Sequence, residues 1–245
     1  MVLNVAAYHF VHVEDPAGLA ARLRAQAEAR ELRGTVLVAA EGVNLFLAGD
    51  EDAVRGFVDA LRADPRFADI VVKESRSRSL PFARLKVKVK PEIISFRRDA
   101  SSPLAGRAPT VAPKTLMRWL QKGHDDTGKR VVMLDTRSAQ EAEYGSFADA
   151  EILPIAKFTD LPAAVEARKD RWRDATVVSF CTGGIRCEKA ALWMRDEAGI
   201  DNVLQLEGGI LGYFEQAGGF GYQGRCFVFD GRVALDPDLA PLADG

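Results

Sequence analysis

The residues best suited to chemistry are a cysteine and an arginine at the two ends of a short glycine loop. Cys181 follows the apolar run Val177–Phe180, and Gly183, Gly184 and Arg186 come next, just before a segment with helical periodicity. Sites in parallel sheets collect beyond the carboxyl ends of strands. Glycines let successive N–H groups point inward, and the start of a helix adds partial positive charge. The sequence therefore predicts an ionised, nucleophilic Cys181 in an anion cradle, formed by Thr182, Gly183, Gly184, Ile185 and Arg186.

A free cysteine is most often a small buried apolar residue, so a structural role is an alternative for each of the three cysteines. It is disfavoured for Cys181, because strand, cysteine, glycines, arginine and helix follow in one order. It is favoured for Cys187, which falls in the start of the predicted helix. It is also favoured for Cys226, for which a resolving thiol is the alternative.

A second charged cluster leaves the end of another apolar run, Val131–Leu134. Asp135 and Arg137 follow this run, and Glu141 comes shortly after. Since the carboxyl ends of parallel strands share one sheet edge, we expect these residues near Cys181 as supports of its loop. The alternative is that Asp135 and Arg137 are solvated loop charges or an internal ion pair.

The elements around these residues predict two domains. From residue 114 onward, apolar strands over 131–134, 177–180 and 203–206 alternate with helices, which is typical of an α/β domain with a parallel sheet. Before residue 95 the order is strand, helix, strand, strand, helix, strand, which predicts a ferredoxin-like α+β domain. Pro, Gly and Ser interrupt all periodicity between these regions. The expected division is a domain over 1–95, a linker over 96–113, an α/β domain over 114–222 and a C-terminal tail over 223–245.

Composition limits the class of protein. The chain has 245 residues, 47% of them hydrophobic, and a formal charge of −2, so it is neither fibrous nor disordered and not a strongly basic nucleic-acid binder overall. No run reaches the roughly 20 apolar residues of a membrane span, and the start lacks a signal-peptide pattern. Three cysteines cannot form a disulfide framework. We therefore expect a cytoplasmic protein with reduced thiols and no membrane partner.

A local run of cations suggests contact with RNA. Between residues 73 and 90 the chain carries several basic side chains and a single acidic one, Glu74. Three lysines alternate with valines in this run, which would place them on one face of a strand. Such a stripe can follow phosphates, although lysines also protect exposed sheet edges from aggregation. The RNA-binding candidates are Arg76, Arg78, Arg84, Lys86, Lys88 and Lys90.

No cofactor or metal site can be identified from the residues themselves. The chain has three histidines, and no triad of two histidines and a carboxylate is evident. No flavin or nicotinamide fingerprint is present either. The residues alone therefore lead to an activated thiol beside a candidate RNA-binding domain, and not to a particular redox reaction.

Two of these motifs resemble a known superfamily. Asp135-x-Arg137 with Glu141, followed by Cys181-x-x-Gly-x-Arg186, is similar to the rhodanese (sulfurtransferase) domain, whose loop cysteine carries a persulfide. The related phosphatases have a loop one residue longer, so the resemblance implies sulfur chemistry rather than phosphate-ester hydrolysis.

The resemblance becomes closer over nearly the whole chain. Four segments are similar to the oxygen-dependent tRNA uridine(34) hydroxylases: Gly34–Asn44, Leu80–Ile93, Cys181–Lys189 and Cys226–Asp230. This family implies an acylphosphatase-like domain followed by a rhodanese domain. It also implies conversion of the wobble uridine to 5-hydroxyuridine, with Cys181 essential, molecular oxygen as co-substrate and the tRNA anticodon loop as partner. DNA is not an expected partner. Many members carry a cysteine-rich extension after Cys226–Asp230, whereas no cysteine follows here, and Ser138 replaces a usual asparagine.

Three functions remain open on the sequence alone. The first is the tRNA-modifying oxidoreductase. The second is a sulfurtransferase that carries a persulfide on Cys181 and takes sulfur from a donor or passes it to a carrier. The third, a non-catalytic interaction or redox-sensing module, is disfavoured because Cys181 and Arg186 are both present.

Overall fold

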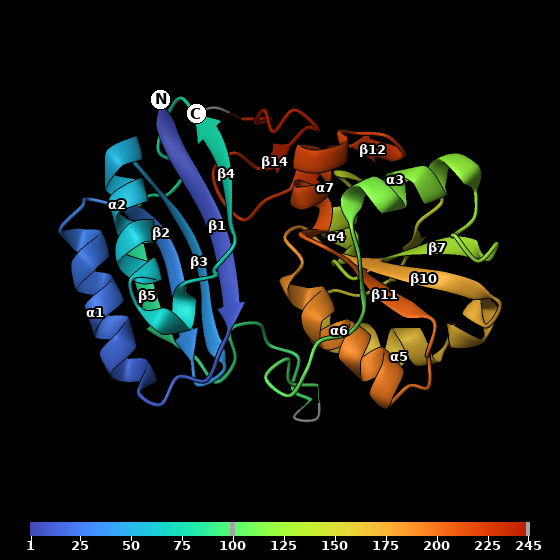
Figure 1. The fold of residues 1–245 in the computed structure, drawn as a ribbon. Helices are drawn as coiled ribbons and strands as arrows, with labels where there is room; N and C mark the ends of the chain where they lie inside the picture. Colours follow the sequence, from blue (N-terminus) through green and yellow to red (C-terminus); the bar gives the residue numbers. More distant parts are fainter. Residues whose placement is uncertain (99–100, 244–245) are drawn as a thin grey trace. The chain divides into compact units, whose positions relative to one another are not determined.

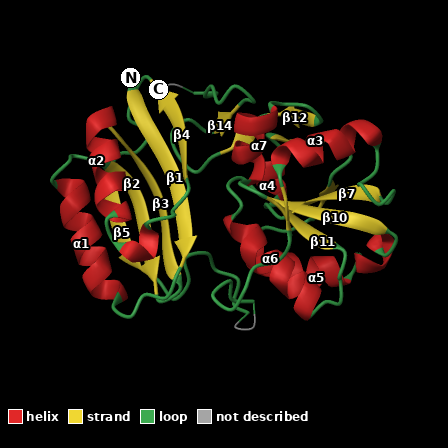
Figure 2. Cartoon of the chain, viewed as in Figure 1, coloured by secondary structure: helices red, strands yellow, loops and turns green. Residues whose placement is uncertain are grey.

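The computed structural model describes residues 1–98 and 101–243. The chain divides into two compact units, each with its own sheet and helices (Figures 1 and 2). Met1–Ser95 forms the first unit, together with Phe229–Val233 and the described residues from Ala240 onward. Phe96–Val228 and Ala234–Leu239 form the second. The C-terminal segment therefore contributes short stretches to both units.

The first unit has the predicted ferredoxin-like architecture. Its sheet has the strand order β4-β1-β3-β2-β5, and both helices lie against one face of it (Figure 1). The fifth strand, β5, runs parallel to β2 and forms an edge. In chain order the elements are β1 (Val2–Phe10), α1 (Pro16–Glu28), β2 (Arg33–Ala39), β3 (Gly42–Gly49), α2 (Glu51–Arg62), a 3-10 turn (Pro65–Phe67), β4 (Val72–Ser77) and β5 (Leu85–Val89).

Local sequence signals explain both helices. Asp15 caps α1 by accepting a hydrogen bond from the backbone of Gly18, and Asp50 caps α2 in the same way. The apolar side chains of α2 recur at helical spacing and are all buried against the sheet: Val54, Phe57, Val58 and Leu61.

One strand is displaced from its expected position. The sequence predicts a strand over 70–73, whereas β4 spans Val72–Ser77. The N–H of Ile70 closes the preceding 3-10 turn by donating to the carbonyl of Phe67, so Ile70 is buried without being in the sheet. Pairing with β1, from Ala7↔Val72 to Val2↔Ser77, sets where β4 begins and ends.

The second unit confirms the predicted parallel α/β domain. Its sheet has the order β6-β11-β10-β7-β9, and each neighbouring pair is parallel. The strands are β6 (Thr110–Val111), β7 (Arg130–Asp135), β9 (Glu151–Ile152), β10 (Ala175–Phe180) and β11 (Val203–Leu206). The helices are α3 (Pro113–Lys122), α4 (Ala139–Ala142), α5 (Leu161–Glu166), α6 (Ile185–Asp196) and α7 (Gly209–Ala217), with 3-10 turns over Phe158–Asp160 and Lys169–Trp172.

Two stretches expected as connecting segments contribute to the fold. The expected linker over 96–113 contains β6, which pairs with β11, and Phe96 is buried in the core of the second unit. The expected tail over 223–245 contains β13 (Cys226–Phe227), which pairs with β14 (Ala234–Leu235). The remaining two-stranded sheet joins β8 (Gly145–Phe147) to β12 (Tyr222–Gly224). Residues 99–100 of that linker and 244–245 of that tail lie outside the described residues.

Across the described residues, every helix is too short or too polar to cross a bilayer.

Candidate active site

The cysteine loop begins where the central strand of the second unit ends. All six residues of β10 are buried, and the strand pairs with β7 so that Phe180 lies opposite Asp135. The next residues, Cys181 and Thr136, therefore leave the sheet side by side. Thr136 ties the two strand ends together, because its N–H and its hydroxyl both donate to the carbonyl of Phe180, at 3.0 and 2.9 Å.

Backbone amides from two helix starts hold this loop. The N–H of Gly184, the N-cap of α6, donates to the sulfur of Cys181 at 3.2 Å. At the start of α7, Ile210 and Leu211 donate to the carbonyls of Cys181 and Thr182 at 2.9 and 3.0 Å. Of the loop amides predicted to form a cradle, those of Gly184 and Arg186 contact the sulfur, and the start of α7 holds the loop backbone.

The sulfur of Cys181 is buried, but the groups around it are polar. Burial alone raises the pKa of this thiol. A hydrogen bond from Cys187, the positive charge of Arg186 and the amides of Arg186 and Gly184 act in the opposite direction and lower the pKa to about 5. The side chain of Cys181 is 0% exposed, yet its contacts favour a thiolate at neutral pH.

Cys187 takes the complementary protonation state. It lies in the first turn of α6, where burial raises its pKa well above the usual value and the adjacent Cys181 raises it further. Its sulfur also lies 3.6 Å from the hydroxyl oxygen of Thr136. Cys187 therefore stays a thiol and donates a hydrogen bond to the Cys181 sulfur, which goes beyond the structural role that the sequence favoured.

Arg186 is fixed by a carboxylate. Its two terminal nitrogens donate to Glu141 at 2.8 and 2.7 Å, and its guanidinium also hydrogen bonds the sulfur of Cys181. Glu141 in turn accepts from the backbone and hydroxyl of Ser138, at 3.0 and 2.9 Å, in a capping box at the start of α4. Glu141 thus holds the arginine of the cysteine loop from a distant part of the sequence.

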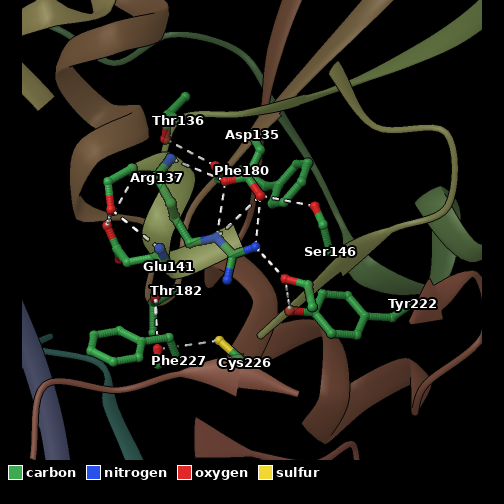
Figure 3. Close-up of polar contacts among 12 residues, drawn as sticks. Asp135, Thr136, Arg137, Glu141, Ser146, Phe180, Thr182, Tyr222, Cys226 and Phe227 are labelled. Atoms are coloured by element: carbon green, nitrogen blue, oxygen red, sulfur yellow. Dashed lines mark hydrogen bonds and ion pairs between the residues drawn. The ribbon is translucent and has the colours of Figure 1, made fainter. Parts of the chain in front are cut away.

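Asp135 and Arg137 form a buried ion pair, one of the two alternatives that the sequence left open. Both side chains are 0% exposed, and their closest nitrogen–oxygen distance is 2.6 Å. Ser146 donates to Asp135 at 2.8 Å, and Arg137 also donates to the carbonyl of Gly145 at 2.6 Å (Figure 3). Both side chains hydrogen bond to residues of β8, so the ion pair connects the end of β7 to β8.

Cys226 lies next to the same loop. Burial raises the pKa of its thiol to about 12, which keeps it protonated. Its sulfur lies 3.7 Å from the carbonyl oxygen of Phe227, and the hydroxyl of Thr182 donates to that oxygen at 3.3 Å (Figure 3). This contact holds β13 against the loop and fits the structural role favoured for Cys226.

The RNA-binding candidates do not form one surface. Lys86 and Lys88 are exposed on β5, at one edge of the first unit's sheet, and the exposed Lys90 directly follows this strand. Arg76 lies on β4 at the opposite edge, where it donates to Glu51 at 2.7 and 2.9 Å. The single stripe suggested by the sequence is therefore divided, because three strands separate the two edges. Arg78 and Arg84 are exposed in the connection between the end of β4 and the start of β5.

The alternation of the lysine strand holds only in part. Val87 is buried at 7% exposure and packs on the core, as expected. Val89 is 51% exposed, because β5 is an edge strand and ends at this residue. The alternation expected for the lysine run therefore holds only from Lys86 to Lys88.

Sequence reasoning missed one residue that the loop requires. Gly209 has φ +64°, and a Cβ at this position would lie 2.5 Å from the carbonyl oxygen of Cys181. The signal was present in the sequence, since Gly208 and Gly209 stand between β11 and a helix. Only tertiary packing brings Thr136 and Cys187 to the cysteine.

No group of three histidine, cysteine or acidic side chains within residues 1–98 and 101–243 is arranged to hold a metal ion. The chemistry that this site offers from its own side chains is that of an anionic sulfur beside a fixed guanidinium.

Comparison with known proteins covers almost the whole chain. A family model described as a UPF0176 acylphosphatase-like domain matches residues 2–93, and a rhodanese-like domain model matches residues 115–216. A protein of Xanthomonas euvesicatoria pv. vesicatoria (strain 85-10), named tRNA uridine(34) hydroxylase, is 64% identical and covers 100% of this chain and 98% of the relative. Relatives with the same name from Xanthomonas campestris pv. campestris (strain B100) and Xylella fastidiosa (strain 9a5c) are 64% and 62% identical, over 96% and 95% of their own lengths.

Proposed function

The chain belongs to the family of the tRNA uridine(34) hydroxylases, and from this premise we propose that it converts uridine at wobble position 34 of tRNA to 5-hydroxyuridine. Cys181 is the reactive residue in this proposal. The observation that carries it is the sulfur of Cys181, held anionic by Arg186 and by the amide of Gly184 at 3.2 Å.

The site suits a reaction at a base that has left its stack. Enzymes that act on a nucleobase require it to be unstacked, and the anticodon loop presents such bases. A thiolate can form a covalent bond to the electron-poor uracil ring. Arg186 and the loop amides would then hold the negative charge that moves from the sulfur to the ring.

We propose molecular oxygen as the co-substrate. One oxygen atom is inserted at C5 of the base, and the second is reduced to water by two electrons and two protons. The reaction therefore also needs a two-electron reductant. With tRNA as substrate, we place the protein in the cytoplasm, with the anticodon loop as its binding partner.

A sulfurtransferase is the second candidate function. The amide of Gly184 and the guanidinium of Arg186 would stabilise a persulfide anion on Cys181 as well as a thiolate. This alternative requires a sulfur donor or a carrier protein and makes no use of RNA.

The deciding experiment is mass spectrometry of tRNA nucleosides. A deletion strain is complemented with the wild type or with Cys181→Ala, at protein levels matched by immunoblot. We expect 5-hydroxyuridine and its derivatives to fall on deletion and to return only with the wild type. Unchanged 5-hydroxyuridine on deletion contradicts the proposal. Thiosulfate turnover by purified protein without affinity for tRNA favours the sulfurtransferase.

A further inference from the structure

A pocket in the first unit is separate from the cysteine loop. It encloses about 290 Å³. Its wall combines Ser77 and residues 79–83 with Gly231 and Arg232, and Arg33 and Ala243 complete the lining. These wall segments coincide with or directly follow two of the sequence motifs, Leu80–Ile93 and Cys226–Asp230, parts of which have no role in the active site. Two motifs that are far apart in the sequence therefore meet at this pocket.

Hydrogen bonds and an ion pair fix the wall of this pocket. The N–H of Gly231 donates to the carbonyl of Pro81 at 2.9 Å. Arg232 is 7% exposed, pairs with Asp230 at 2.6 Å and donates to the hydroxyl of Ser75 at 2.5 Å. A buried, paired arginine and a backbone hydrogen bond therefore fix this part of the wall.

The lining has the chemistry that an unpaired nucleotide requires. Leu80, Pro81 and Phe82 provide an apolar and aromatic wall, and Arg33 provides an exposed cation. None of the ten lining residues, all of them described, is acidic. Bases of single-stranded RNA stack on aromatic side chains while arginines contact the phosphates. A volume of about 290 Å³ lies at the small end of ligand pockets, which suits one nucleotide and excludes a duplex.

We propose that this pocket binds one unpaired nucleotide of the tRNA substrate, with the base against Phe82 and its phosphate on Arg33. The inference rests on the proposed function and adds a second, non-catalytic contact to it. Base stacking gives affinity with little sequence preference, and the arginine adds a salt-dependent part.

Salt titration separates the two contacts. Binding of an anticodon stem-loop RNA to the full chain is measured by fluorescence anisotropy over a range of salt concentrations. Phe82→Leu keeps the apolar volume and removes the ring, so we expect affinity to fall about tenfold with an unchanged salt slope. Arg33→Ala should weaken binding and reduce the slope of log K against log salt by roughly 0.7–0.9. Phe82→Tyr should bind like the wild type.

Matched variants and a crosslink guard against indirect effects. Arg22→Ala on α1 and Phe220→Ala in the second unit remove an exposed arginine and an exposed phenylalanine outside the pocket, and both should bind normally. RNA carrying 4-thiouridine should crosslink to the peptide that contains Phe82. Normal binding by Phe82→Leu together with crosslinks elsewhere overturns the pocket while leaving the proposed function intact. Absence of RNA binding by the wild type instead overturns the proposed function, and the pocket proposal with it.

Discussion

Arg186 donates two hydrogen bonds to Glu141, at 2.8 and 2.7 Å, across 45 residues of sequence. This pair fixes the guanidinium whose positive charge lowers the pKa of Cys181. The position of the charge that stabilises the thiolate therefore depends on the capping box of α4 as well as on the cysteine loop.

Removing Glu141 should destabilise the second unit. The side chains of the pair are only 9% and 8% exposed, so Glu141→Ala removes the carboxylate that a buried guanidinium pairs with. Breaking a buried pair in this way costs roughly 3–5 kcal/mol. Urea denaturation measures the change. Glu74→Ala is the control, because its carboxylate pairs with Arg55 at an exposed site, and its effect should be much smaller. Equal effects of the two variants would contradict the role given to Glu141.

The same pair predicts a pH dependence of stability. Burial raises the pKa of Glu141, but the hydrogen bonds and charge of Arg186 lower it to a net value below normal. Its stabilising contribution is therefore complete above the unfolded pKa of about 4.3 and is lost as the pH falls through the lower folded value. The stability difference between the wild type and Glu141→Gln should shrink as the pH is lowered from about 6 to about 3. A stability difference independent of pH would show that the charge of Glu141 does not contribute to stability.

Cys187 should set the titration of Cys181. Ultraviolet absorbance of the thiolate, corrected with Cys181→Ser, should give a midpoint near 5 for the wild type. Cys187→Ala removes the S–H donor, and because a hydrogen bond to a charged group contributes about 1.5–3 kcal/mol, the midpoint should rise by roughly 1–2 pH units. Cys187→Ser keeps a donor and should restore much of the shift. An unchanged midpoint in Cys187→Ala would mean that Arg186 and the loop amides lower the pKa of Cys181 without Cys187.

Two glycines near the cysteine should respond differently to alanine. Gly209→Ala places a Cβ 2.5 Å from the carbonyl oxygen of Cys181 at φ +64°, so it should lower the melting temperature and displace the loop. Gly183→Ala is the matched control, because a Cβ there meets no atom within 4 Å. Thermal denaturation and the thiolate titration report the two effects. Similar melting temperatures for both variants would contradict the close approach of α7 to the loop.

The two edges of the first unit's sheet should differ in RNA binding. Lys88 on β5 is exposed, and if it contacts a phosphate, Lys88→Ala should weaken binding of tRNA and reduce the salt slope by roughly 0.7–0.9. Arg76 is held by Glu51, so Arg76→Ala should have the smaller effect. Filter binding at several salt concentrations measures both. A larger effect of Arg76→Ala would place the RNA at the β4 edge instead.

The sequence by itself determined the two-domain fold and the position of the cysteine loop at the end of a buried strand. Apolar runs at 131–134 and 177–180 identify buried parallel strands, and the order of Cys181, the glycines and Arg186 is local, so each is readable along the chain. The same holds for α2, whose four apolar residues at helical spacing are all buried.

Only the tertiary structure decided which groups surround the sulfur. The pairing of β7 with β10 brings Thr136 to Cys187, and α7 brings Gly209 to the carbonyl of Cys181. Sheet order likewise divided the basic run between residues 73 and 90 into two opposite edges. Local periodicity specifies which face of an element is buried, whereas contacts between distant elements depend on strand order and register, which the pattern of one segment does not contain.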